Sequence, residues 1–194
     1  MPKNLRISAY RQGRLDGLCG VYATINAVRL TCSTPNQRFS IFGKRLFEAC
    51  LNHLALNWPL ADVVANGMTN EQLLACLKLV KSHLKIKRKI NIRLTRPLIG
   101  SSHKTLADVI DVMAVFLSQH GRSIILGYST LDGGHWTVVR SVGVTAFNLV
   151  DSSGASRLTF AQLTYRNWRK AKAEGKRDLT PTGIIFLEWV NGVG

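Results

Sequence analysis

A cysteine and a histidine in glycine-rich surroundings are the residues of this chain best suited to chemistry. Cys19 lies in the segment Asp16–Gly20, at the predicted beginning of an apolar helix. His135 follows two glycines at the predicted beginning of a β-strand, and Asp151 ends the next predicted strand. A thiol nucleophile, a histidine base and an acid that orients the base are the components of acyl transfer through a thioester. The spacing therefore predicts thiol-based cleavage of a carbonyl derivative.

The predicted place of Cys19 suits a nucleophile. A free thiol has a pKa of about 8.5, and a helix N-terminus or a neighbouring imidazolium favours the reactive thiolate. The first N–H groups of a helix have no partner within the helix, so they can face an oxyanion. The alternative interpretation of Cys19, taken alone, is a buried core cysteine.

The pairing of His135 with an acid can be tested by counting along a β-hairpin. If a tight turn at Gly143 joins the two strands, His135 stands directly opposite Asp151. Opposed residues have Cβ atoms about 4.5–5.5 Å apart, which lets a carboxylate hold an imidazole N–H. Asn148 falls on the other face, although a slip of one residue in the turn would reverse that conclusion. We therefore expect Asp151 to orient His135.

The remaining elements indicate an α+β fold, with helices first and antiparallel strands later. Capping boxes at Thr69–Gln72 and Thr105–Asp108 each precede an apolar helical stripe, and Gly121 is the expected C-cap of the second stripe. Further helices are expected at 19–30 and 39–54, and strands at 123–128, 135–142, 145–151 and 183–189.

The segment Leu84–Leu94 alternates apolar and basic residues with a period of two, which predicts a strand. Lysines on an edge strand protect it against aggregation, and this interpretation is favoured. The functional alternative is that Lys85–Arg93 forms a surface that recognises an acidic partner. A second basic stretch, 166–177, is expected to form an exposed helix or loop.

Composition sets the class of protein. The chain has 194 residues, enough for one domain, 1–194, and its 26 Lys and Arg against 11 Asp and Glu give a net charge of +15. Such a charge favours nucleic acid, anionic membrane or acidic protein as partners, without choosing among them. No apolar run reaches the ~18 residues of a membrane span, and no secretory signal core is present. We expect a cytoplasmic protein, or an effector delivered by a route that needs no signal peptide.

The four cysteines show no Cys-x-x-Cys pair and no metal-binding spacing with histidine. Cys50 and Cys76 lie in apolar helical patterns and are interpreted as reduced core residues. We therefore expect neither a metal nor another cofactor.

The chain resembles the papain-like cysteine peptidases, and within them the bacterial C39-like peptidases. The residues that carry the resemblance are Gln12, Asp16, Cys19, Gly20, His135, Trp136 and Asp151. It implies Cys19 as nucleophile, His135 as general base and acid, and Asp151 as the residue that orients His135. It also implies Gln12 as an oxyanion-hole donor, and a papain-like fold whose nucleophile helix packs on a C-terminal antiparallel sheet.

The function predicted from the sequence is a metal-independent cysteine peptidase that acts on a protein or peptide substrate. The same triad serves glutamine deamidases and transglutaminase-like effectors, which remain the first alternative. The second alternative is an inactive polyanion-binding protein. Nucleic acid is the less favoured polyanion, because no aromatic residues for base stacking lie near the basic stretch. Insertion into a membrane is not expected.

Overall fold

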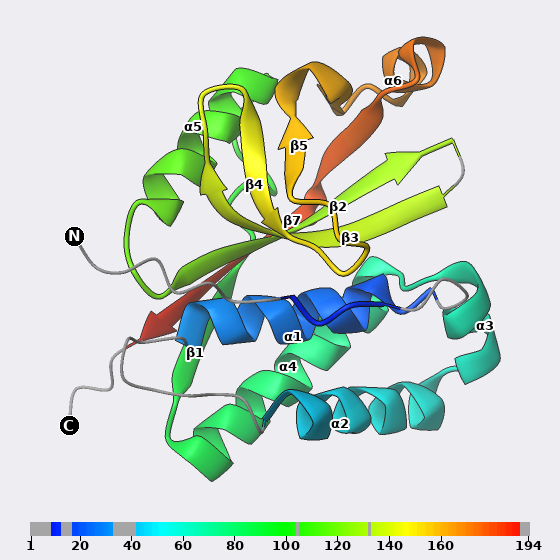
Figure 1. Cartoon of the computed structure of the whole chain (residues 1–194), viewed down its shortest axis with the longest axis vertical. Coiled ribbons are helices and arrows are strands. Elements are labelled where there is room, and N and C mark those ends of the chain that lie inside the picture. The colour runs from blue at the N-terminus through cyan, green and yellow to red at the C-terminus, as the bar shows by residue number, and fades with distance from the viewer. Residues whose placement is uncertain (1–8, 13–16, 33–41, 104, 132, 191–194) are drawn as a thin grey trace.

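The computed structural model describes residues 9–12, 17–32, 42–103, 105–131 and 133–190. The described part is a mixed α/β structure built around one sheet with the strand order β1-β7-β2-β3-β4-β5, and β6 pairs with β7 (Figure 1). All pairs are antiparallel except β6–β7. The strands are β1 (Asn91–Thr95), β2 (Arg122–Thr130), β3 (Gly133–Val142), β4 (Ala146–Val150), β5 (Arg157–Thr159), β6 (Leu163–Tyr165) and β7 (Arg177–Val190).

Helices cover both faces of this sheet, and each face has its own apolar core. The helices are α1 (Cys19–Cys32), α2 (Phe42–Asn57), α3 (Leu60–Asn66), α4 (Asn70–Arg88), α5 (Leu106–Leu117) and α6 (Trp168–Glu174). Along β2, Ile125 joins the core beneath α1, α2 and α4, whereas Ile124 and Leu126 join the core beneath α5. This alternation is the two-residue period of a strand that is buried on both faces.

The central helix α1 lies between the sheet and the pair formed by α2 and α4 (Figure 1). Only Tyr22, Arg29 and Leu30 of its 14 residues are partly exposed. A helix surrounded in this way must be apolar on all sides, which accounts for its composition and confirms the expected helix. The sheet places β3 and the beginning of α1 side by side.

Both predicted capping boxes are present. The Thr69 hydroxyl accepts a hydrogen bond from the N–H of Gln72, and the Thr69 N–H donates to the side chain of Gln72. Thr105 and Asp108 form the same pair of bonds at α5. The expected C-cap at Gly121 was wrong, because α5 already ends at Leu117 with Ser118 as its cap.

The predicted strand over Leu84–Leu94 was wrong in its first half. Helix α4 continues to Arg88, Lys89 caps it in the left-handed conformation, and only Asn91–Thr95 form the edge strand β1. The reason is that Leu84 extends the buried stripe that begins at Leu73, so that helical packing outweighs the local alternation. Lys85–Arg93 is therefore the end of a helix followed by an edge strand.

Candidate active site

Cys19 is the first residue of α1, and the chain before it is fixed by a close backbone contact. The N–H of Gly17 donates to the carbonyl of Val64 at 2.6 Å. A Cβ on Gly17 would lie 2.7 Å from that carbonyl and from the backbone nitrogen of Gly67, so only glycine fits. Cys19 is 5% exposed, and its Sγ lies 3.8 Å from the carbonyl oxygen of Gly17. The thiol therefore lies at a helix N-terminus, where the dipole favours a negative charge.

His135 and Asp151 form a close pair across β3 and the end of β4. The Nε2 atom of His135 lies 2.8 Å from Oδ2 of Asp151. The carboxylate side chain is 1% exposed and the imidazole 20%, so Asp151 lies beneath His135. The other carboxylate oxygen, Oδ1, accepts the backbone N–H of Ser153 at 2.7 Å and the hydroxyl of the same residue. These bonds hold the acid in one orientation.

The expected hairpin register was wrong, although both residues lie on the same face. The ladder pairs Val138 with Val150, and a shift near Arg140 disrupts it on the side of the turn. Continued past β4, this pairing would place Asp151 opposite Thr137, two residues from His135. Diagonal neighbours of this kind remain within reach of long side chains. The rejected candidate Asn148 donates instead to Ser141 and does not orient His135.

The hydrogen bonds at Asp151 keep it ionised despite its burial. Burial by itself would raise the pKa of Asp151, but the hydrogen bonds from His135 and Ser153 lower it to about 2. A carboxylate that accepts several hydrogen bonds is stabilised in its charged form. Asp151 therefore remains an anion at every pH at which a thiol could react.

The imidazole of His135 is held between this anion and the thiol of Cys19. Burial alone would lower the pKa of His135, but hydrogen bonds with Asp151 and with Cys19 raise it to about 9. Because Nε2 is bonded to Asp151, Nδ1 is the ring nitrogen that remains for the thiol. The arrangement favours the imidazolium form of His135.

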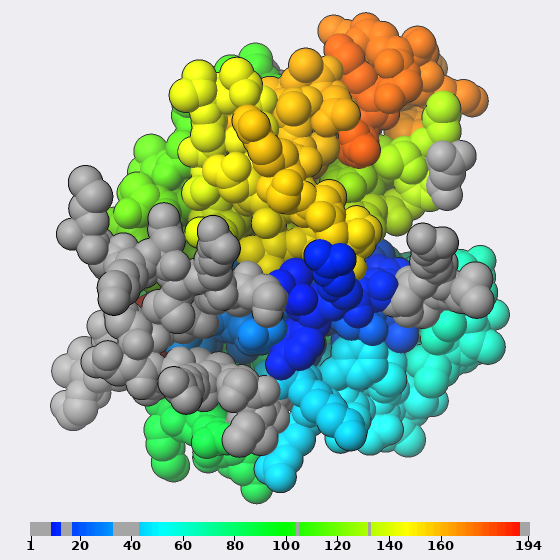
Figure 2. Space-filling model, in the orientation of Figure 1, coloured from blue at the N-terminus to red at the C-terminus, as the bar shows by residue number. Residues whose placement is uncertain are grey.

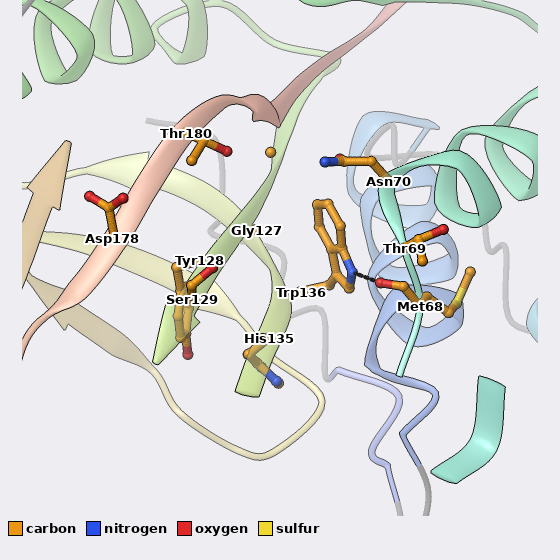
Figure 3. Close-up of a pocket in the computed structure, with 12 residues that line it drawn as sticks. Met68, Thr69, Asn70, Gly127, Tyr128, Ser129, His135, Trp136, Asp178 and Thr180 are labelled. Carbon is orange, nitrogen blue, oxygen red and sulfur yellow. Dashed lines mark hydrogen bonds between the residues drawn. The ribbon is translucent and has the colours of Figure 1, made fainter. Parts of the chain in front are cut away.

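Trp136 fills the space between β3 and the beginnings of α1 and α4 (Figure 3). Its indole N–H donates to the carbonyl of Met68 at 2.9 Å. A Cβ on Gly127 would overlap the Trp136 ring, and one on Gly20 would lie 2.7 Å from Sδ of Met68. A Cβ on Gly20 would also lie 3.3 Å from the Trp136 ring, so both glycines let the indole pack closely at the start of α1.

A cleft of about 230 Å³ begins at His135 and passes between β2, β7 and the start of α4 (Figure 3). Tyr128 lies against the imidazole, with ring centroids 5.5 Å apart. The other lining residues are mainly small or polar, among them Asn70, Ser129 and Thr180. An extended chain could reach the histidine from this cleft. Sequence reasoning missed Tyr128, because nothing in a buried strand distinguishes it from a core aromatic.

Gln12 lies beside the turn that carries Asp151. Its backbone N–H donates to the carbonyl of Ser152 at 3.0 Å, and the Ser152 hydroxyl donates to its Oε1 at 3.2 Å. The same segment is held to α1 by the buried amide of Asn26, which exchanges two hydrogen bonds with the backbone of Tyr10. Figure 2 shows these N-terminal residues, in blue, at the surface between the yellow β4–β5 region and the cyan α2. Sequence reasoning missed Asn26, whose signal is an amide within an apolar helix.

The other three cysteines lie in the core, which confirms the predicted core positions of Cys50 and Cys76. Burial raises the pKa of Cys32 to about 12. A hydrogen bond with Cys76, together with burial, raises the pKa of Cys50. Within the described residues no group of three or more His, Cys, Asp or Glu side chains could hold a metal ion.

None of the described helices is both long and apolar enough to cross a membrane.

No model of a known protein family matches the chain, and no curated protein matches it. Among solved structures, the chain is similar to the Pseudomonas avirulence protein AvrPphB, with 11% identity and a TM-score of 0.39. The similarity covers 95% of this chain and 96% of that one.

Proposed function

We propose that the protein is a papain-like cysteine peptidase that cleaves an amide bond in a protein or peptide through Cys19, His135 and Asp151. The observation that carries the proposal is the position of the His135 ring. Its Nε2 atom is 2.8 Å from a buried carboxylate, and its other side interacts with a thiol at a helix N-terminus. This combination supplies a nucleophile, a base and an orienting acid in one place.

In the proposed reaction the proton of Cys19 Sγ moves to Nδ1 of His135, and the thiolate attacks the amide carbon. As the C–S bond forms and the C–N bond breaks, His135 returns the proton to the leaving amine. Water then attacks the thioester carbon and gives one proton to His135. As the C–S bond breaks, the carboxylic acid leaves and His135 returns its proton to the sulfur of Cys19. Asp151 holds the imidazole in one tautomer and stabilises its charged form throughout.

Two groups are suited to stabilise the oxyanion that forms during attack. The backbone N–H groups of the first turn of α1 point toward the beginning of that helix, where Cys19 lies. Gln12 is the proposed second donor. The Ser152 hydroxyl donates to its Oε1, so the other atom at the end of this side chain is the N–H₂ group, which can donate a hydrogen bond to an oxyanion.

The first experiment is mass spectrometry of the native protein after brief treatment with a sub-stoichiometric alkylating agent. Activation predicts labelling of Cys19 and protection of the three core cysteines. His135→Ala should abolish this selectivity, whereas the matched control His120→Ala, at an exposed histidine, should retain it. Equal labelling of all four cysteines, or unchanged labelling in His135→Ala, would contradict an active triad.

Peptide-bond cleavage is tested by incubating a peptide library with the wild type and with Cys19→Ala. New N-termini that require Cys19 would support a peptidase. Conversion of glutamine to glutamate without new N-termini would overturn the peptidase proposal and indicate a deamidase that uses the same three residues.

A further inference from the structure

Helix α4 from Lys78 onward, together with its C-cap Lys89, carries a group of lysines that the proposed reaction does not use. The exposed residues of this lysine end are Lys78, Lys81, Lys85, Lys87 and Lys89. None of the ion pairs found among the described residues involves them. The sequence contains no Asp or Glu from Gln72 to Ala107, so neighbours in the chain do not neutralise them.

Among the other exposed lysines of the described chain, Lys172 also lacks an ion pair, whereas Lys44 and Lys170 each have one. Lys44 lies 3.8 Å from Glu48, and Lys170 and Lys176 both lie within 4 Å of Glu174. A helix dipole accounts for positive charge only in the last turn, where Lys85 and Lys87 lie. The dipole does not account for Lys78 and Lys81, which precede the last turn. The lysine end therefore carries positive charges that no ion pair found among the described residues neutralises.

An apolar side chain lies within this charge. Ile86 stands between Lys85 and Lys87 in the chain and is 67% exposed. Figure 1 shows α4 ending at the lower edge of the molecule. Exposed cations on the same helix as an exposed aliphatic residue match a surface with anionic headgroups over an apolar layer.

We propose that the lysine end of α4, together with the exposed Ile86, docks the protein on an anionic lipid bilayer. Nucleic acid fits less well, because Trp58, the aromatic residue that lines a pocket together with Lys78, is partly buried against the core and has little surface left for stacking on bases. The group also consists of lysines, which lack the planar guanidinium that lets arginine bind a phosphate through two hydrogen bonds. The docking is peripheral and needs no helix that spans the membrane.

Docking through this end leaves the candidate active site open. Asn70, at the start of α4, lines the cleft beside His135, and the 19 residues of the helix span roughly 28 Å. Variants of the lysine end should therefore change membrane binding without changing the reactivity of Cys19.

The test is flotation of the full chain, in a Cys19→Ala background, with phosphatidylcholine vesicles that contain or lack phosphatidylserine. We expect binding only to the anionic vesicles, and weaker binding at high salt. Replacing the five lysines by glutamine should lower the partition coefficient by roughly a hundredfold or more. Ile86→Ser should lower it about tenfold without changing the net charge.

The matched control removes five positive charges elsewhere, around α6. It replaces Arg166, Arg169, Lys170, Lys172 and Lys176 by glutamine. This region also exposes Trp168, so it is the strongest competing site for a membrane. The control should lose much less binding than the α4 variant, and circular dichroism checks that both variants fold.

Four results would overturn the proposal: equal binding to neutral vesicles, equal loss in both five-site variants, loss only in the α6 variant, or binding to DNA without binding to vesicles. Because the vesicle assay uses a protein without its nucleophile, its failure would not affect the peptidase proposal. Failure of Cys19 alkylation would likewise leave membrane docking intact.

Discussion

His135 Nε2 and Asp151 Oδ2 lie 2.8 Å apart, although the β3–β4 ladder does not place the two residues directly opposite each other. The contact is diagonal, and the hydrogen bonds from Ser153 turn the carboxylate toward the ring. A diagonal contact depends on side-chain orientation more than a direct one does. The bonds around Asp151 should therefore control the charge on His135.

The first prediction concerns the pKa of His135, measured by NMR titration of the ring nitrogens. The wild type should titrate near pH 9, because Asp151 and Cys19 both favour the imidazolium. Asp151→Asn should lower this pKa more than Cys19→Ala does, since the bond with Asp151 is the larger favourable contribution. A wild-type value near 6.5 that Asp151→Asn leaves unchanged would contradict the arrangement.

The second prediction concerns stability against pH. The pKa of His135 is raised from 6.5 to about 9, so its stabilising contribution is complete below pH 6.5 and is lost as the pH rises through 9. The pKa of Asp151 is lowered from 3.8 to about 2, so its contribution is complete above pH 3.8 and is lost as the pH falls through 2. The melting temperature of the wild type minus that of His135→Gln should thus be constant from pH 4 to 6.5 and decrease toward pH 9. A difference that grows over the alkaline range would refute this sign.

The third prediction separates oxyanion stabilisation from activation of the thiol. Gln12→Ala should reduce kcat on an amide substrate by about 10- to 1,000-fold, the range for loss of one such donor. Alkylation of Cys19 forms no oxyanion and should continue at the wild-type rate. Ser152→Ala, which removes only the bond to Oε1, should have the smaller effect on kcat. Equal loss of turnover and of alkylation in Gln12→Ala would assign this residue a purely structural role.

The fourth prediction compares two glycines near His135. Gly127→Ala would force a Cβ into the ring of Trp136 and should lower the free energy of unfolding by about 1–3 kcal/mol or more. Gly134→Ala is the matched control, because the nearest atom to its Cβ would be the Tyr128 carbonyl oxygen at 3.7 Å. Its stability should change by less than about 1 kcal/mol. Chemical denaturation measures both, and equal stability of the two variants would show that the Trp136 packing is not tight.

Local patterns were sufficient to predict most elements around the site. The apolar run after Cys19 predicts a buried helix, the capping boxes fix the starts of α4 and α5, and apolar runs mark the central strands. Residue types and their spacing along the chain also identified Cys19, His135 and Asp151 as candidate site residues. Their catalytic roles remain predictions for the experiments above.

Helix caps, the alternation along the central strands and the glycines around Cys19 depend on neighbours along the chain, so they can be read from the residues alone. Features that depend on distant partners became visible only in the folded chain. It shifted the β3–β4 register, extended α4 through Leu84, and placed Gln12 against Ser152. The physical reason is that burial against another element and hydrogen bonds between distant segments contribute more free energy than the local pattern, and only the folded chain brings those segments together.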